Sequence, residues 1–202
     1  MGSKCCITID RQYGSGGREV ARILSERLGM PCYGQELLAV TAADNGISLD
    51  ELRKLDEKRT GSLLHDLVLY AFRFQNYNKM QEPFDINKEV CATIRRLAEK
   101  EPCIFIGRCA DFALEGVCRT LDLFIYAASM EERKERICGI DRVALEKAEE
   151  AIHKRDSQRS DYYHYFTGRN WSDMTHYDAC LNTSAFGYEG CAEIVMKMME
   201  RV

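Results

Sequence analysis

Residues 5–20 have the sequence CCITIDRQYGSGGREV, and this stretch decides the fold. Its first five residues, Cys5 to Ile9, carry no charge and favour β-structure, the pattern of a strand buried on both faces of a sheet. A glycine-rich turn follows over 14–17. After it, apolar residues recur at helical spacing from Arg18 to Leu28, and Gly29 ends the expected helix. The stretch therefore predicts a strand, a glycine-rich turn and a helix, in that order.

The glycine-rich turn is a candidate phosphate-binding site, because such a turn gathers backbone N–H groups at the positive end of a helix. The full P-loop pattern is G-x-x-x-x-G-K-[ST]. With Gly16 as its second glycine, Arg11 stands at the first glycine and Gly17 at the lysine, so the loop is degenerate. The alternative is a turn that uses glycine only for its backbone freedom.

Two charged residues follow the loop directly. Arg18 comes one residue after the lysine position, and a guanidinium there can hold phosphate with two hydrogen bonds. If Arg18 replaces the lysine, Glu19 stands where a hydroxyl would help to place Mg²⁺. The alternative explanation for Glu19 is that an acidic residue in the first turn complements the helix dipole.

The rest of the chain alternates short apolar runs with helical patterns. Further strands are expected at 31–33, 102–106, 121–127 and 179–182, and helices at 35–43, within 49–100, and at 130–137, 143–160 and 191–199. This alternation predicts an α/β domain with a parallel sheet of about five strands and helices on both faces. Such sheets bind ligands at the carboxyl ends of their strands, where the glycine-rich loop and Gly107-Arg108 both lie.

Composition excludes several classes of protein. The 202 residues fit one domain, and a net charge of −4 gives no basic field for nucleic acid. No apolar run approaches the roughly 18 residues that a membrane span needs. The ten cysteines include no C-x-x-C pair, and several fall in apolar runs (Cys5, Cys6, Cys103, Cys180), so we expect reduced, mostly buried thiols without zinc. A cytoplasmic protein is expected.

Over nearly its whole length the chain resembles the cytidylate kinases, and in particular their cytidylate kinase-like branch. The resemblance rests on the loop stretch 11–18, on Ile104-Phe105-Ile106-Gly107-Arg108, on the strand at 123–127 with its following helix, and on Arg155-Asp156 with Arg159. It implies a three-layer P-loop kinase sandwich formed as a single domain over 1–202. Within it, residues 46–100 would form a helical acceptor-binding insert and about 139–170 a lid.

The resemblance also implies ATP-dependent phosphoryl transfer, with Mg²⁺, to a nucleoside monophosphate such as CMP or dCMP. Donor phosphates would contact the loop and its neighbours: Arg11, Gly14, Ser15, Gly16, Gly17, Arg18, Glu19 and Arg136. The acceptor would contact Arg108, Asp111 and Tyr33. Charge on the transferring group would be neutralised by Arg18, Arg108, Arg155 and Arg159.

Three departures from the family pattern keep an alternative open. Gly17 and Glu19 replace the lysine and hydroxyl, and Ile106 stands where cytidylate kinases carry an acidic residue. Glu19, Asp10 and Asp111 remain as candidate metal ligands. A nucleotide-binding module that has lost transfer is therefore the second hypothesis, and self-association into a homo-oligomer through the helical insert is a third. Charges on 143–159 would equally suit a solvated surface helix.

Overall fold

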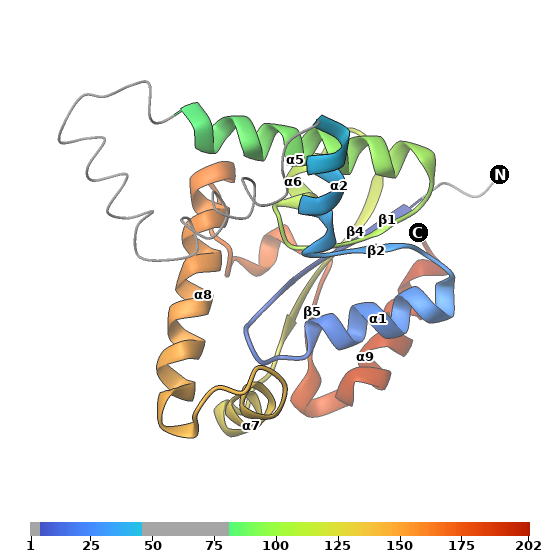
Figure 1. Ribbon diagram of the computed structural model, residues 1–202. Coiled ribbons are helices and arrows are strands. Elements are labelled where there is room, and N and C mark those ends of the chain that lie inside the picture. Colours follow the sequence, from blue (N-terminus) through green and yellow to red (C-terminus); the bar gives the residue numbers. More distant parts are fainter. Residues whose placement is uncertain (1–4, 46–80) are drawn as a thin grey trace.

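The computed structural model describes residues 5–45 and 81–202 (Figure 1). In chain order the elements are β1 Cys5–Arg11, α1 Gly17–Leu28, β2 Cys32–Tyr33, α2 Glu36–Asn45, α5 Gln81–Lys100, β3 Ile104–Ile106, α6 Ala110–Leu114, β4 Arg119–Tyr126, α7 Met130–Ile140, α8 Leu145–Thr167, η2 Met174–His176, β5 Ala179–Asn182 and α9 Thr183–Met199. Within these ranges, no helix is long and apolar enough to cross a membrane.

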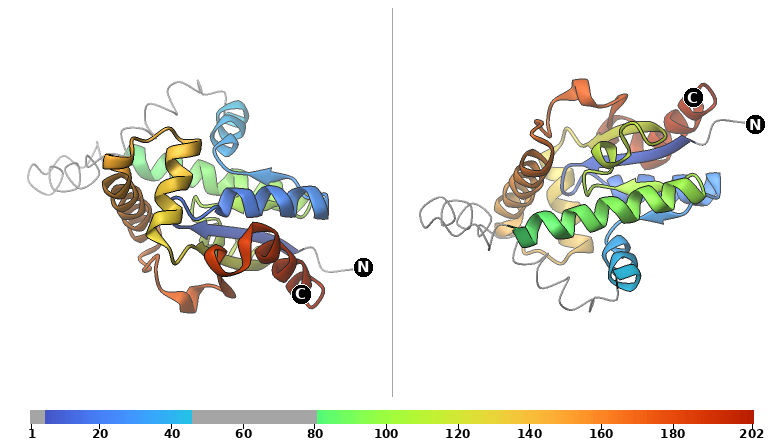
Figure 2. Two further views of the ribbon diagram at one scale, coloured as in Figure 1. Left: turned by 90° about the horizontal axis from the view of Figure 1, so that it is seen from below. Right: turned by 90° about the horizontal axis from the view of Figure 1, so that it is seen from above.

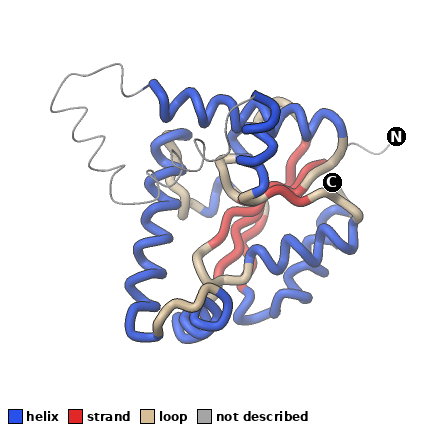
Figure 3. The backbone as a smooth tube through the Cα atoms, in the orientation of Figure 1, coloured by secondary structure: helices blue, strands red, loops and turns tan. Residues whose placement is uncertain are grey.

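The five strands form one sheet in the order β2-β3-β1-β4-β5, and every pairing is parallel. Figure 3 shows the strands as a single layer between helices. Strand β1 is central: Ile9 lies opposite Ile106 of β3, and Arg11 lies opposite Ile125 of β4. The expected parallel α/β sheet with helices on both faces is confirmed.

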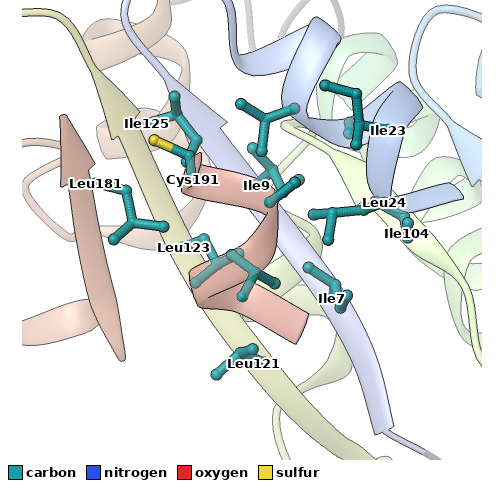
Figure 4. Packing of buried hydrophobic residues seen from close by; sticks show 14 of the residues in the cluster. Ile7, Ile9, Ile23, Leu24, Ile104, Leu121, Leu123, Ile125, Leu181 and Cys191 are labelled. Atoms are coloured by element: carbon teal, nitrogen blue, oxygen red, sulfur yellow. The ribbon is translucent and has the colours of Figure 1, made fainter. Parts of the chain in front are cut away.

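Alternation along β1 divides its side chains between the two faces of the sheet. Cys5, Ile7 and Ile9 pack with buried residues of α1 and α9, and Figure 4 shows this core around Leu24 and Cys191. Cys6 instead joins the core formed with α2, α5 and α6. The first loop leaves the sheet on the side of α1, while α7 and α8 lie beside the carboxyl ends of the strands (Figures 1 and 2).

Several helices depart from the expected bounds. Helix α8 continues to Thr167, beyond the expected end at 160, and stops where Gly168 adopts a left-handed conformation. Helix α9 begins at Thr183 rather than at 191, because the Asn182 side chain caps it by accepting from the Ser184 N–H; a kink at Gly187 interrupts its periodicity. These helix ends are determined by capping contacts and by glycine conformations, and the spacing of apolar residues contains no information on either.

All ten cysteines lie in the described ranges and are free thiols. Cys5, Cys6 and Cys103 are buried as expected. Cys180 is exposed, because β5 is an edge strand and presents this residue to solvent. Of the expected helical insert, residues 46–80 lie outside the described residues, whereas α5 packs its carboxyl half into the core through Val90, Ile94 and Leu97.

Candidate functional site

The loop after β1 is held in a fixed shape by its glycines and by hydrogen bonds. Gly14 and Gly16 have φ angles of +80° and +81°, the left-handed region that glycine adopts most readily. The hydroxyl of buried Ser15 lies 2.9 Å from the Gln12 carbonyl and 3.1 Å from that of Ile125. Because the first N–H groups of a helix have no intrahelical partner, this shape presents amides at the start of α1.

Side chains from α7 and α8 bind the outer side of this loop. Arg133 donates from Nε to the Tyr13 carbonyl at 2.8 Å and forms an ion pair with Asp156. Asp156 Oδ1 accepts from the Tyr13 N–H at 2.7 Å. Arg159 donates to the Arg11 carbonyl at 2.7 Å, and the guanidinium carbons of Arg155 and Arg159 each lie 5.7 Å from the centroid of the Tyr13 ring. Helix α8 is therefore docked on the loop.

Arg133 was missed by the sequence reasoning, which chose Arg136 on the same helix. Arg133 is only 5% exposed, and a Cβ placed on Gly14 would lie 2.7 Å from its carbonyl oxygen. Arg136 instead stacks on Tyr188, with 4.5 Å between its guanidinium carbon and the ring centroid. Gly16 leaves room for that same ring. The sequence does not distinguish Arg133 from Arg136, because the two residues lie only three positions apart in the same run of charged residues.

The two charged residues at the start of α1, Arg18 and Glu19, lie in different surroundings. Arg18 is exposed, and strict P-loop spacing puts it at the hydroxyl position, one residue after Gly17. Glu19 Oε1 accepts from Nε and from a terminal nitrogen of Arg22, at 3.0 and 2.5 Å. These hydrogen bonds lower the pKa of Glu19. The Glu19 carboxylate is thus paired within its own helix.

The turn after β3 is unusual because three successive residues have positive φ: Gly107 at 67°, Arg108 at 64° and Cys109 at 53°. Non-glycine residues adopt this region uncommonly, and such turns concentrate at functional sites. The Gly107 N–H donates to the Ile9 carbonyl at 3.0 Å, which ties the turn to the end of β1. The Arg108 guanidinium carbon lies 6.0 Å from the Tyr162 ring centroid.

Two buried carboxylates lie beneath this turn. Asp10 and Asp111 are each 8% exposed. The Tyr163 hydroxyl donates to Asp111 Oδ2 at 2.5 Å, and a terminal nitrogen of Arg11 lies 3.8 Å from Asp10 Oδ1. Burial raises the pKa of Asp10, Arg11 opposes this, and the nearby charge of Asp111 raises it further. Two acidic groups in one buried place are costly unless a cation joins them.

Two buried nitrogens in this neighbourhood have no hydrogen-bond partner among the described residues. They are Nε of Arg11 and the indole Nε1 of Trp171, which lies close to Asp10 without a bond of standard geometry. Buried polar groups are nearly always paired with protein, water or ligand. These two atoms therefore mark a place where the protein alone leaves polar groups unmatched.

Burial lowers the pKa of Arg11, and the like charges of Arg159, Arg18 and Arg108 lower it further, while Asp10 raises it. Burial also lowers the pKa of Arg159, to about 10. The structure thus brings together Arg11, Arg18, Arg108 and Arg159 around the carboxyl ends of β1 and β3. An excess of positive charge at that place suits an anion.

Tyr33 lies apart from this group. Its ring stacks on Phe105, with 5.8 Å between centroids and 23° between planes. Its pKa is raised by burial and by Cys103 and Glu101, which lie at the amino end of β3. The structure therefore does not bring Tyr33 together with Arg108 and Asp111.

In the parts of the chain that the structure describes, no three His, Cys, Asp or Glu side chains form a group that could hold a metal ion alone. Mg²⁺ in nucleotide sites is held by one or two carboxylates together with substrate phosphates, so a larger protein cage is not required. Asp10 and Asp111 fit that donor set, since they are buried, close and of like charge. Glu19 fits it less well, because Arg22 donates two hydrogen bonds to its Oε1.

Solved structures with the same fold include kinases. An uncharacterised protein from Eubacterium ventriosum superimposes with a TM-score of 0.73 at 23% identity, covering 98% of this chain and 99% of that one. Shikimate kinase from Acinetobacter baumannii superimposes with a TM-score of 0.52 at 11% identity, covering 99% and 94%. At these identities the likeness shows the fold alone, which is that of the P-loop kinases.

Sequence relatives extend over most of the chain. A cytidylate kinase of Methanothermobacter thermautotrophicus is 29% identical over 184 residues, which are 91% of this chain and 98% of that protein. A cytidylate kinase of Sulfurisphaera tokodaii is 27% identical over 192 residues, 94% and 92% of the two chains. The model of the cytidylate kinase-like family matches residues 6–185. The chain therefore belongs to the cytidylate kinase-like family.

Proposed function

We propose that this protein transfers the terminal phosphoryl group of ATP to a nucleoside monophosphate of the CMP or dCMP type. The observation that carries the proposal is the meeting of four arginines, Arg11, Arg18, Arg108 and Arg159, beside a helix N-terminus at the ends of β1 and β3. Phosphoryl transfer requires chiefly positioning and neutralisation of charge, which such groups provide. Family membership and the kinase fold support the same chemistry.

The donor phosphates would lie against the loop amides of Gly14 to Gly17, with Arg18 and Arg136 on its rim. The acceptor phosphate would bind Arg108, which the positive-φ turn holds next to the end of β1. Arg159 and Arg155, both on α8, would lie between the donor and acceptor phosphates and neutralise the charge of the transferring group. The donor would therefore bind at the carboxyl end of β1, and the acceptor at the carboxyl end of its neighbour β3.

Bound Mg²⁺ would supply charge neutralisation between the donor phosphates, and Asp10 and Asp111 are the residues we propose to hold it. Arg11 keeps Asp10 partly compensated in the absence of the ion. Tyr163 orients Asp111 by its hydrogen bond. Glu19 remains the alternative ligand, and Arg22 would have to release it.

We further propose that residues 139–170 act as the lid and that 46–100 form the acceptor-binding insert of a single domain. The docking of α8 through Asp156 and Arg159 supports the first part, since it links this helix to the loop backbone. A lid that contacts the loop can exclude water from the reaction. From the insert, the Asn87 amide donates to the Tyr162 hydroxyl at 3.1 Å, next to Arg108.

The test is release of ADP from ATP and Mg²⁺ in the presence of each of a panel of nucleoside monophosphates, by wild type and Arg108→Met. We expect turnover with one pyrimidine acceptor and its loss in the variant, with ATP binding retained in calorimetry. ATP binding without turnover on any acceptor would favour the binding-module hypothesis. Absence of both binding and turnover would remove the proposal altogether. Arg119→Met, an exposed arginine at the amino end of β4, is the control and should behave as wild type.

A further inference from the structure

The loop differs from a P-loop at two positions that face each other in space. The P-loop pattern has glycine at its first position and lysine at its seventh. Here Arg11 stands at the first position and Gly17 at the seventh, so the long cationic residue and the small residue have exchanged places. Strand alternation explains why they meet: residue 11 shares the face of Ile7 and Ile9, which is the face covered by α1, and Gly17 is the first residue of that helix.

The exchange is sterically matched. A Cβ placed on Gly17 would lie 2.7 Å from Cβ and 3.0 Å from Cγ of Arg11, closer than real side-chain contacts allow. The stem of Arg11 therefore occupies the space that a lysine at position 17 would need. Gly17 has no positive φ, so its requirement for glycine is one of space and not of backbone conformation.

The guanidinium of Arg11 lies between the two halves of the site. On one side its stem covers the start of α1, and on the other a terminal nitrogen packs against Gly107, where a Cβ would collide with it. Its Nε is buried without a hydrogen-bond partner in the described part of the chain, and its terminal nitrogen Nη1 lies 3.8 Å from Asp10 Oδ1. One donor of this largely buried cation, Nε, is thus unpaired at the point between the loop and the Gly107-Arg108 turn.

We propose that Arg11 supplies, from the first position of the loop, the cation that a P-loop lysine supplies from the seventh, and that it contacts the terminal phosphates of a bound nucleoside triphosphate. The inference rests on the proposed function for the identity of the ligand. It transfers the role of the lysine from exposed Arg18 to an arginine that is already in place before the ligand binds. Arg18, Arg108 and Arg159 surround Arg11 with like charge, which an anion at this point would relieve.

The first experiment compares ATP and AMP binding by calorimetry for wild type, Arg11→Met, Arg18→Met and the control Arg119→Met. Methionine keeps the packing of the arginine stem and removes the charge. We expect Arg11→Met to weaken ATP binding by about 10- to 100-fold, as for loss of a charge-assisted hydrogen bond, and AMP binding by much less. A collapsed loop would weaken both ligands together. The inference is overturned if Arg11→Met binds ATP as Arg119→Met does, or if Arg18→Met loses more.

The second experiment reverses the exchange. Gly17→Lys alone should lower the thermal midpoint and the ATP affinity, because two long side chains then compete for one space. Arg11→Gly alone should lose ATP affinity through the missing charge. The double variant Arg11→Gly/Gly17→Lys restores the first glycine and the lysine of the P-loop pattern, with Arg18 still at its hydroxyl position. It should bind ATP more tightly than either single variant, within about tenfold of wild type. A double variant that binds ATP no better than Arg11→Gly overturns the inference.

The outcomes separate this inference from the proposed function. Wild type that binds ATP without phosphoryl transfer to any acceptor would end the kinase proposal, while the binding comparison of Arg11 and Arg18 would still decide the inference. Turnover that persists in Arg11→Met with unchanged affinity for ATP would end the inference and leave the kinase proposal in place.

Discussion

The two strand ends that form the site are built in opposite ways. After β1, the loop is fixed by backbone contacts: Gly14 and Gly16 leave no room for a side chain, and Arg133 and Asp156 bind both polar groups of the Tyr13 peptide. Between this loop and the turn after β3, Asp10 and Arg11 at the end of β1 carry buried charge that the protein pairs only in part. The comparison teaches that changes to the contacts of α7 and α8 with the loop should act mainly on folding, and changes to the charged side chains between the loop and the turn mainly on ligand binding and pH dependence.

The largest effect on stability is expected from Arg133→Met. This change removes the shorter of the two ion pairs of Asp156, leaving only that with Arg159 at 4.0 Å, and leaves the Tyr13 carbonyl without its donor. Breaking a largely buried pair in this way should reduce the free energy of unfolding by about 3 kcal/mol. Denaturant unfolding measures the loss. Arg136→Met, one helical turn later and stacked on Tyr188, should cost less than about 1 kcal/mol. Equal losses would contradict the comparison.

A smaller effect is expected from Gly14→Ala, which tests the close approach of α7 to the loop. A Cβ there would meet the Arg133 carbonyl at 2.7 Å, in addition to the cost of a left-handed alanine. We expect a loss of about 2 kcal/mol or more. Gly116→Ala is the matched control, since its φ is +72° and nothing lies within 4 Å of its Cβ position. It should lose about 1 kcal/mol, from backbone conformation alone. The difference between the two losses measures the contact.

The acceptor side is tested by Arg108→Met, for which ligand binding should change more than stability. We expect acceptor affinity to fall about 20-fold, or roughly 1.8 kcal/mol, through loss of a charge-assisted contact to phosphate. ATP affinity should stay within about threefold of wild type, because the donor loop does not include this residue. Calorimetry with each nucleotide separately measures both. A large fall in ATP affinity would mean that the two strand ends do not divide donor from acceptor.

Patterns local in sequence predicted the sheet and the approximate place of most of its elements. The uncharged run at 5–9 and the spacing of apolar residues over 18–28 were enough to predict β1 and α1, because the pattern of buried positions alone determines the strand-like and helical spacing. The Gly-Arg pair after β3 also lies at the expected edge of the sheet. These features depend on neighbours in the chain.

Contacts distant in sequence could not be predicted. Arg133 reaches Tyr13 across 120 residues, and Asp156 reaches it across 143. In the sequence both residues belong to charged runs that suit a solvated helix equally well. Only the crossing of α7 and α8 over the loop separates Arg133 from Arg136. The fit of Arg11 against Gly17 is also invisible in sequence, because it depends on which face of β1 the helix covers.

The smallest expected effect is a change of stability with pH at Asp10. Its folded-state pKa is raised, mainly by burial and also by Asp111, above the ordinary value of an aspartate. A group of this sign favours folding when protonated and disfavours it when ionised, so stability is lost as the pH rises through its folded-state pKa. Asp10→Asn resembles the protonated form. It should therefore raise the midpoint of thermal unfolding at pH 7, and the gain should shrink as the pH falls to about 4 and below.

Asp173 provides the opposite case for the same measurement. Hydrogen bonds from Thr175, first from its side chain and then from its backbone, lower the pKa of Asp173. Its contribution is present above the ordinary aspartate pKa and is lost as the pH falls, so Asp173→Asn should lower the midpoint at pH 7 and approach wild type in acid. If both variants shifted in the same direction with pH, the buried charge at Asp10 would not be the cause. Opposite slopes, with the Asp10 gain abolished by saturating Mg²⁺ and ATP, would show that a ligand compensates the buried charge of Asp10 at the end of β1.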